Sequence, residues 1–292
     1  MNRTAISWCT HTVNPIRANG RQGHRGHYCE KVSPGCKNCY ASAMQRRFGM
    51  PEFAEQRREG VEVFLDTAVL QGVLRARATD AILFWCDMTD AFGSWVPDEW
   101  LDQILAVCAL TPQITHVIVT KRAEQMREYF SRHDTGLRWA KAAREMMPTA
   151  SHQTNRKIPK LTPEQAVAWA RGLPNLLLGI SAENQAQLDA RAPYLAQLAA
   201  EGWRTFWSLE PILERMYLQP HLGSRRPELA IIGGESGHRY RDCGVQTILD
   251  AVEECLAAGV PVHCKQDCAV RPGQQGRIPE AVWRLKALPE RR

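Results

Sequence analysis

Residues 175–184 read Asn-Leu-Leu-Leu-Gly-Ile-Ser-Ala-Glu-Asn, an apolar run that ends in small and polar residues. The unbroken apolar part predicts a strand that is buried on both faces, as in a parallel sheet. The pattern recurs along the chain, and each run after the first is followed by a charged residue with small or polar neighbours. The expected strands are residues 5–8, 81–85, 116–119, 175–180, 205–207, 229–232 and 260–263.

Helical patterns occupy the segments between these strands. Residues 98–110 follow a proline and carry acids in the first turn, and residues 246–258 end before Gly259, where a helix C-cap belongs. Residues 182–200 also fit a helix, which Pro193 should kink or split. Strands that alternate with helices predict an α/β fold, a partial or complete parallel (βα) barrel with about six or seven βα units.

Length and spacing predict the domain organisation. The chain has 292 residues, and α/β barrels of about 250 residues often form one domain. We therefore expect one barrel domain over residues 1–292, with insertions at about 49–80 and 133–172. The second insertion is basic. It should contain a loop at residues 147–152 and a helix that begins after Thr162.

The composition is that of a folded protein, with 44% hydrophobic and 23% charged residues. No apolar run approaches the roughly 20 residues that a membrane-spanning helix needs. The N-terminal segment lacks the apolar core of a signal peptide, so we expect a cytoplasmic protein with no membrane contact. In a reducing cytosol the ten cysteines should not form disulfides, which favours metal binding or redox chemistry where they cluster.

The net charge of +6 is concentrated in two segments. Residues 17–58 contain nine Lys or Arg and three Glu, and residues 132–172 contain eight Lys or Arg and three acids. These segments suit an anionic partner such as DNA or RNA. Two solvated basic surfaces without a polyanion explain the charge equally well.

The residues after the expected strands should meet at one face, because the carboxyl ends of barrel strands converge there and form the active site. Ordinary strand-end ion pairs, such as Lys121 with Glu183, are the alternative. The candidate residues are Asp87, Asp90, Lys121, Ser181, Glu183, Asn184, Glu210, Gly233, Gly234, Glu235 and Lys265.

A loop with three cysteines follows the first expected strand. Cys36 and Cys39 have the spacing that lets two thiolates hold one metal centre, and Cys29 can supply a third. Three thiolates leave one iron of a cubane cluster open, whereas a zinc site would take His24 or His27 as its fourth ligand. Spacing alone leaves iron and zinc open. The position over the expected barrel mouth favours a catalytic cluster.

Several motifs together resemble the phage-associated three-cysteine-motif family, whose function is uncharacterised. They are Trp8 and residues 32–41, 120–122, 179–185, 208–211, 233–237 and 265–266. That family looks like a divergent branch of the radical S-adenosylmethionine (SAM) superfamily. There, a partial (βα) barrel of the TIM type holds a [4Fe-4S] cluster on three cysteines, and SAM chelates the fourth iron. This chain departs from that pattern in having six residues between Cys29 and Cys36, where three are usual, and Asn38 at a commonly aromatic position.

The resemblance implies a role for each matching residue. Cys29, Cys36 and Cys39 would ligate the cluster. Lys121, Glu210 and Lys265 would remain for substrate or catalysis. The remaining strand-end residues would bind SAM, namely Asp87, Asp90, Ser181, Glu183, Asn184, Gly233, Gly234 and Glu235.

The expected function is that of a radical SAM enzyme that cleaves SAM reductively to a 5′-deoxyadenosyl radical and modifies or repairs nucleic acid. Its partners would be DNA or RNA on segments 17–58 and 132–172, an electron donor and a phage-encoded protein. The alternatives are a zinc-stabilised nucleic-acid-binding or nuclease-like phage protein, and a barrel that keeps its cluster without turnover. Cys243, Cys264 and Cys268 could form a second metal centre, or they could be unrelated thiols near the barrel mouth, and the sequence leaves both readings open.

Overall fold

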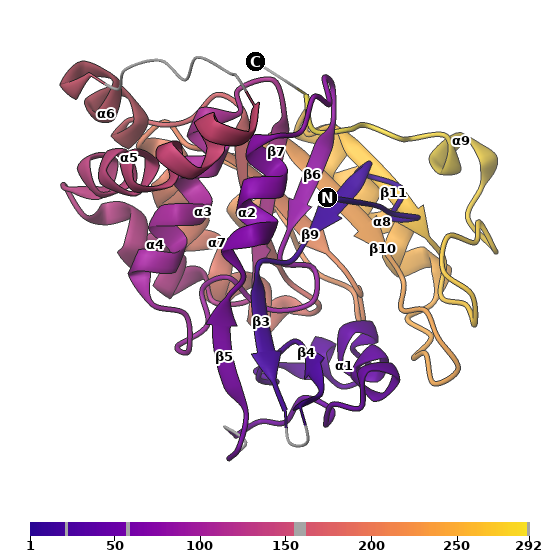
Figure 1. Ribbon diagram of the computed structural model, residues 1–292. Coiled ribbons are helices and arrows are strands. Elements are labelled where there is room, and N and C mark those ends of the chain that lie inside the picture. The colour runs from indigo at the N-terminus through magenta and orange to yellow at the C-terminus, as the bar shows by residue number, and fades with distance from the viewer. Residues whose placement is uncertain (21–22, 57–58, 155–161, 291–292) are drawn as a thin grey trace.

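The computed structural model describes residues 1–20, 23–56, 59–154 and 162–290 (Figure 1). Its centre is an eight-stranded sheet in the order β1-β2-β6-β7-β8-β9-β10-β11, in which only β1 is antiparallel to its neighbour. The strands are β1 (Asn2–Arg3), β2 (His11–Val13), β6 (Ile82–Trp85), β7 (Thr115–Thr120), β8 (Leu176–Ser181), β9 (Arg204–Leu209), β10 (Leu229–Gly233) and β11 (Val262–Gln266). The α/β prediction is confirmed, and the sheet is a curled half-barrel whose edge strands do not pair within the described residues.

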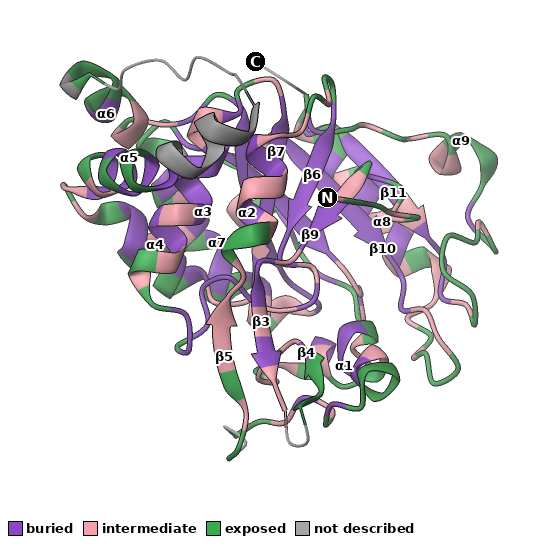
Figure 2. Ribbon diagram, viewed as in Figure 1, coloured by how far each residue is buried: buried purple, intermediate pink, exposed green. Residues whose placement is uncertain are grey.

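Helices connect the parallel strands and complete the core (Figures 1 and 2). Alternate residues of the strands, such as Trp85 and Ile180, are buried in the large core that the sheet shares with the helices. The other residues of the strands face the inside of the half-barrel. The helices are α2 (Thr67–Leu74), α3 (Asp98–Leu110), α4 (Ala123–Ser131), α5 (Thr135–Thr154), α6 (Pro163–Ala170), α7 (Gln185–Ala200), α8 (Val245–Ala257) and α9 (Glu280–Trp283).

The first strand lies later in the chain than predicted. Residues 5–8 are not a strand, and β2 pairs with β6 in their place. Trp8 is only 2% exposed, and its ring lies 4.7 Å from the Phe84 ring and 6.3 Å from the Phe206 ring. The apolar residues of this segment therefore fill the inside of the half-barrel, where burial satisfies them without strand pairing.

A second, small antiparallel sheet in the order β4-β3-β5 was not predicted. It consists of β3 (Ile16–Asn19), β4 (Arg25–Gly26) and β5 (Glu62–Leu65) and lies next to the short helix α1 (Tyr40–Gln45) in Figure 1. It pairs the segment before the cysteine loop with residues of the 49–80 insertion.

The basic insertion consists mainly of helices α5 and α6. The prediction of a loop at residues 147–152 is wrong, because α5 continues to Thr154. The helix expected after Thr162 is confirmed, since the Thr162 side chain accepts a hydrogen bond from the Gln165 backbone. The single-domain organisation stays a prediction.

Within the described ranges, none of the helices has both the length and the apolar character required to cross a bilayer.

Candidate active site

The three-cysteine loop runs from Cys29 to Cys39 and leads into α1. Cys36 ends a 3₁₀ turn that begins at Pro34, and Cys39 is the residue that precedes α1. Cys29 and Cys39 pack against the same small apolar cluster, which contains Phe53 and Met88. Met88 lies just beyond the carboxyl end of β6, so this cluster seats the loop at the mouth of the half-barrel.

Glu183, two residues after β8, attaches the middle of this loop to the sheet. Its fully buried carboxylate accepts a hydrogen bond from the Gly35 backbone at 2.8 Å and another from Arg191 at 3.2 Å. A Cβ atom at Gly35 would lie 3.0 Å from the Glu183 carboxyl carbon, so a glycine permits this approach. Burial raises the pKa of Glu183, but the Lys121 cation and hydrogen bonds from Ser33 and Gly35 lower it overall. Glu183 is therefore an anionic anchor for the cysteine loop.

Glu235, two residues after β10, attaches the Cys36–Cys39 segment. Its buried carboxylate accepts hydrogen bonds from Asn38 Nδ2 at 3.0 Å and from Arg241 Nε at 2.9 Å. Arg241 also donates to the Pro34 carbonyl at 3.1 Å. Burial raises the pKa of Glu235, and the hydrogen bonds from Arg241 and Asn38 outweigh this effect and lower it. A second charged anchor thus holds the loop between its last two cysteines.

Asp87, two residues after β6, attaches the start of α1, directly after the loop. The Tyr40 hydroxyl donates to the Asp87 backbone carbonyl at 2.7 Å and lies 3.2 Å from its carboxylate. Asn14 Nδ2 donates to the same carboxylate at 2.6 Å. Glu183 and Glu235 therefore hold the cysteine loop, and Asp87 holds the first residue of α1 behind it. The three residues follow alternate strands of the sheet, and we call them the acidic anchors.

Asp90 has a different role because its carboxylate is committed to the end of β7. It accepts hydrogen bonds from Thr120 Oγ1 at 2.6 Å and from the Lys121 backbone at 3.1 Å. It also forms a buried ion pair with Arg122 at 3.1 Å, and the Arg122 guanidinium lies over the Trp95 ring. These contacts make Asp90 a residue that orients the strand end that carries Lys121.

A polar row of four side chains crosses the inside of the half-barrel near the strand ends. Lys121 Nζ donates to Ser181 Oγ at 2.7 Å, and Ser181 Oγ donates to the Glu210 backbone carbonyl at 3.1 Å. Lys265 Nζ lies 3.0 Å from Glu210 Oε1. Lys121 also acts on Cys39, whose pKa is raised by burial and lowered in part by this cation. The row, Lys121, Ser181, Glu210 and Lys265, thus lies next to the cysteine loop.

Three further predicted cofactor residues, Asn184, Gly233 and Gly234, lie at the ends of β8 and β10. Asn184 caps α7 and accepts a hydrogen bond from the Gln187 backbone at 3.0 Å. A Cβ atom at Gly233 would lie 3.0 Å from Glu210 Oε1, and one at Gly234 would lie 2.5 Å from the Cys268 sulfur. These glycines therefore let the polar row and the segment after β11 approach β10 closely.

The three thiols are donors of the kind that an iron–sulfur cluster takes. Cys29 and Cys39 pack against the same apolar cluster, and burial raises the pKa of the Cys29 thiol to about 12. Among the described residues, no group of three or more Cys, His, Asp or Glu side chains is arranged so that it could hold a metal ion. His27 Nδ1 lies 3.2 Å from the Ile16 carbonyl, which ties its ring to β3. This contact occupies Nδ1 alone, so His27 Nε2 and the His24 ring are still available as the fourth ligand of a zinc site.

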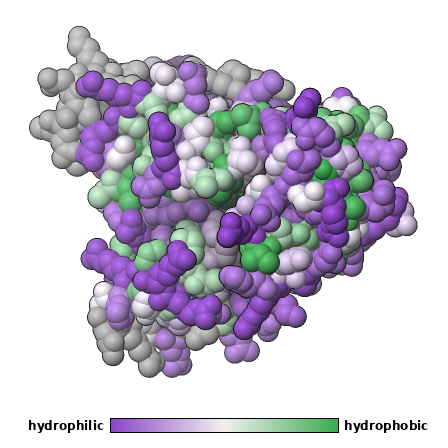
Figure 3. Space-filling view, turned by 90° about the vertical axis from the view of Figure 1, so that its right-hand side faces the viewer, coloured by the Kyte–Doolittle hydropathy of each residue, from purple (hydrophilic) through white to green (hydrophobic). Residues whose placement is uncertain are grey.

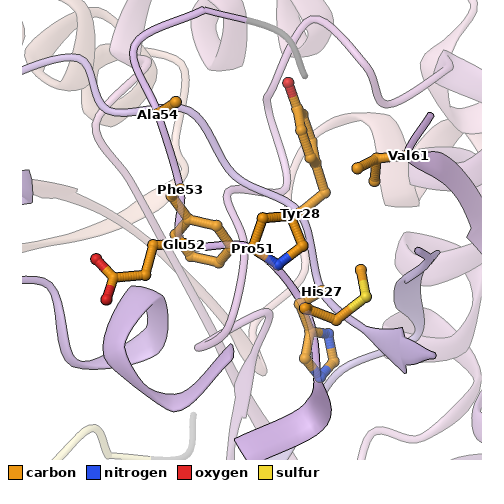
Figure 4. A pocket seen from close by; sticks show the side chains of 8 residues that line it. His27, Tyr28, Pro51, Glu52, Phe53, Ala54 and Val61 are labelled. Atoms are coloured by element: carbon orange, nitrogen blue, oxygen red, sulfur yellow. The ribbon is translucent and has the colours of Figure 1, made fainter. Parts of the chain in front are cut away.

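A small, mainly apolar pocket lies beside the start of the cysteine loop, where Tyr28 and Phe53 line it (Figure 4). Tyr28, which precedes Cys29, and Phe53, which packs against Cys29 and Cys39, both line it. The pocket is lined by His27, Tyr28, Met50, Pro51, Glu52, Phe53, Ala54 and Val61. It is separate from the polar row and contains none of the candidate catalytic residues.

Sequence reasoning missed the residues that complete the acidic anchors, which are Asn14, Asn38, Arg191 and Arg241. Gly35 and Glu183 are 148 positions apart, and Asn38 and Glu235 are 197 apart. Asn38 carried the one available signal, because it stands between Cys36 and Cys39, the cysteine pair that the sequence singles out.

Two solved structures of spore photoproduct lyase are similar to this chain. A variant of the lyase matches with a TM-score of 0.43 and 11% identity, over 82% of this chain and 60% of the lyase chain. The lyase complexed with dinucleoside spore photoproduct matches with a TM-score of 0.40 and 12% identity, over 81% of this chain and 59% of the lyase chain. This chain thus spans about 60% of the length of these lyases. No curated protein matches it significantly in sequence.

A family model matches residues 3–282, nearly the whole chain. The expectation of a family with uncharacterised function agrees with its description, and the phage association stays a prediction. The chain belongs to the family described as "Protein of unknown function (DUF5131)".

Proposed function

We propose that this protein is a radical SAM-type enzyme in which Cys29, Cys36 and Cys39 hold a [4Fe-4S] cluster with SAM at its open iron. The observation that carries the proposal is the attachment of the cysteine loop by the acidic anchors beside the polar row. A structural metal site does not require three buried or half-buried carboxylates from separate strands. A catalytic site must hold its groups at a fixed distance from the reacting atoms, and attachment at several points supplies this.

The bound cluster and SAM would supply the reductive C–S cleavage that yields a 5′-deoxyadenosyl radical. The chain's own residues would position and shield that chemistry. Glu183 holds the Gly35 backbone before Cys36, and Glu235 holds the Asn38 side chain after it. The Trp8 segment would close the inside of the half-barrel against water. Lys121 and Lys265 are the cations of the polar row, and they would bind the carboxylate of SAM or an anionic group of the substrate.

We propose nucleic acid as the substrate class. Arg25, Arg46 and Arg47 are exposed in the segment that carries the cysteine loop, and hydrophilic residues predominate on the face in Figure 3. Basic side chains of this kind position nucleic acid through its phosphates. Arg21, Arg156 and Lys157, which belong to the same two basic segments, lie outside the described residues.

The test is a reductive SAM cleavage assay on anaerobically purified protein, with and without DNA or RNA. We expect 5′-deoxyadenosine to accumulate after reduction, and to accumulate faster with the correct nucleic acid. The control is Cys36→Ser, which should release none. A colourless protein that contains zinc and yields no 5′-deoxyadenosine would overturn the proposal and favour the zinc-stabilised alternative.

A further inference from the structure

Two thiols outside the candidate active site form a close pair. Cys243 precedes α8 and Cys268 follows β11, and their sulfur atoms lie 3.5 Å apart. Both are free thiols, and a disulfide requires an approach to about 2.05 Å. The pair is therefore close enough to bond after a small movement of two loops.

Arg277 holds the two chain segments of this pair together. It donates to Asp242 at 2.9 Å and to Asp267 at 2.8 Å, and each aspartate directly precedes one of the two cysteines. The Asp267 carboxylate is nearly inaccessible, whereas Arg277 and Asp242 are about half exposed. The ion pairs therefore fix the cysteines at a short separation in a partly accessible place.

The two thiols are chemically unequal in a way that suits exchange. The Cys243 thiol donates a hydrogen bond that lowers the pKa of Cys268 to about 7, and the same hydrogen bond raises the pKa of Cys243. A thiol that is partly ionised near neutral pH is an effective attacking group in thiol–disulfide exchange. Cys268 is buried at 8% exposure and Cys243 is half-buried, so a small disulfide reaches the Cys268 sulfur through the same small loop movement that the link itself requires.

We propose that Cys243 and Cys268 are a reversible dithiol–disulfide pair that small-molecule disulfides such as oxidised glutathione oxidise. The Cys268 thiolate attacks one sulfur of oxidised glutathione, and one glutathione thiolate leaves. Cys243, after losing its proton to solvent, attacks the Cys268 sulfur and displaces the second glutathione. The two protein thiols are oxidised to one disulfide, and one oxidised glutathione is reduced to two glutathione molecules.

The pair lies where a covalent link would act on the cysteine loop. Arg241, two residues before Cys243, binds the Glu235 anchor and the Pro34 carbonyl. A Cys243–Cys268 disulfide would tie this segment to the end of β11. It would restrict the Glu235 side of the loop attachment without touching the three loop cysteines.

The experiment equilibrates the full-length protein in buffers of increasing oxidised-to-reduced glutathione ratio, followed by alkylation and peptide mass analysis. We expect the wild type to lose two alkylatable thiols and to yield one peptide pair linked through Cys243 and Cys268. Cys243→Ser and Cys268→Ser should not form this link. Cys264→Ser is the matched control, because Cys264 lies in β11, four residues before Cys268, and is fully buried in the core. This variant should form the Cys243–Cys268 link as the wild type does.

Arg277→Gln is a second probe that leaves both thiols in place. It should require a higher proportion of oxidised glutathione for half-maximal linkage, because the segments are no longer held together. Two results would overturn the proposal: the pair stays reduced at every ratio while the protein remains folded by circular dichroism, or Cys268 links to Cys264 instead.

Discussion

The inner face of the half-barrel differs sharply between the part nearer the amino ends of its strands and the part at their carboxyl ends. In the first part, Trp8, Phe84 and Phe206 form an apolar cluster, and Gly179 makes room for the Phe206 ring, which a Cβ atom there would meet at 2.2 Å. At the strand ends, buried carboxylates bind backbone groups and arginines of distant loops. Apolar packing stabilises the first region directly. In the second region, burying charged groups costs desolvation free energy, and the hydrogen bonds of those groups fix the positions of the loops. This contrast indicates that stability and site geometry reside in separate layers.

The largest effect is expected for Phe206→Ala in the apolar layer. Removing a fully buried ring should lower the free energy of unfolding by about 3–5 kcal/mol, as measured by denaturant unfolding. Iron bound per folded chain should not change if the layers are separate. Phe48→Ala, at a ring that is 40% exposed, is the control and should have little effect on stability.

Glu183→Gln tests the polar layer. The amide can still accept a hydrogen bond from the Gly35 backbone, but Arg191 loses its buried ionic partner. We therefore expect the free energy of unfolding to fall by about 1–3 kcal/mol. Unlike Phe206→Ala, this variant should also lower iron retention per folded chain. Glu253→Gln, at an exposed position of α8, is the matched control. Unchanged iron retention would show that the anchor does not serve the cysteine loop.

Lowering the pH should weaken the core on the helix side of β7 through His116, which is fully buried and accepts a hydrogen bond from Trp85. Burial lowers the His116 pKa to about 3, whereas an unfolded histidine titrates near 6.5. Between these values the unfolded chain binds the extra proton, so the free energy of unfolding falls by about 1.4 kcal/mol for each pH unit below 6.5. His116→Gln should remove this part of the slope between pH 6.5 and 5, and an identical slope in the variant would refute the assignment.

The smallest effect is expected for Asn38→Ala, which removes hydrogen bonds to Glu235 and to the Arg239 carbonyl. The free energy of unfolding should fall by about 1 kcal/mol, while amide hydrogen exchange of residues 35–39 should accelerate. Asn19→Ala, which removes an exposed hydrogen bond to Glu62, is the control. Unaltered exchange in the loop would show that Asn38 does not restrain it.

The parallel sheet was predictable because its strands are short, continuous apolar runs with helical patterns between them, and β7, β8 and β10 lie within about two residues of the predicted ranges. The sequence could not show that residues 5–8 lie outside the sheet, because an apolar segment can be buried against a sheet as well as within one. The sheet of β3, β4 and β5 escaped prediction because its strands are short and partly polar.

The place of the candidate site was predictable from the sequence, whereas the contacts of its residues were not. Glu183 and Glu235 follow strands, so their position at the mouth was expected from the sequence. Their partners, Gly35 and Asn38, belong to a loop near the other end of the chain, and no local pattern connects them. Assigning a carboxylate to a cofactor or to a neighbouring loop requires the tertiary contacts.

The central claim is that the anchored cysteine loop binds an iron–sulfur cluster with an open iron. The most direct measurement reconstitutes the protein anaerobically, counts iron and sulfide, and records the electron paramagnetic resonance of the reduced protein before and after SAM is added. We predict about four iron and four sulfide per chain, loss of both in Cys36→Ser, and a spectrum that changes with SAM. A protein that binds zinc in preference to iron, or a cluster whose spectrum SAM leaves unchanged, would contradict the account.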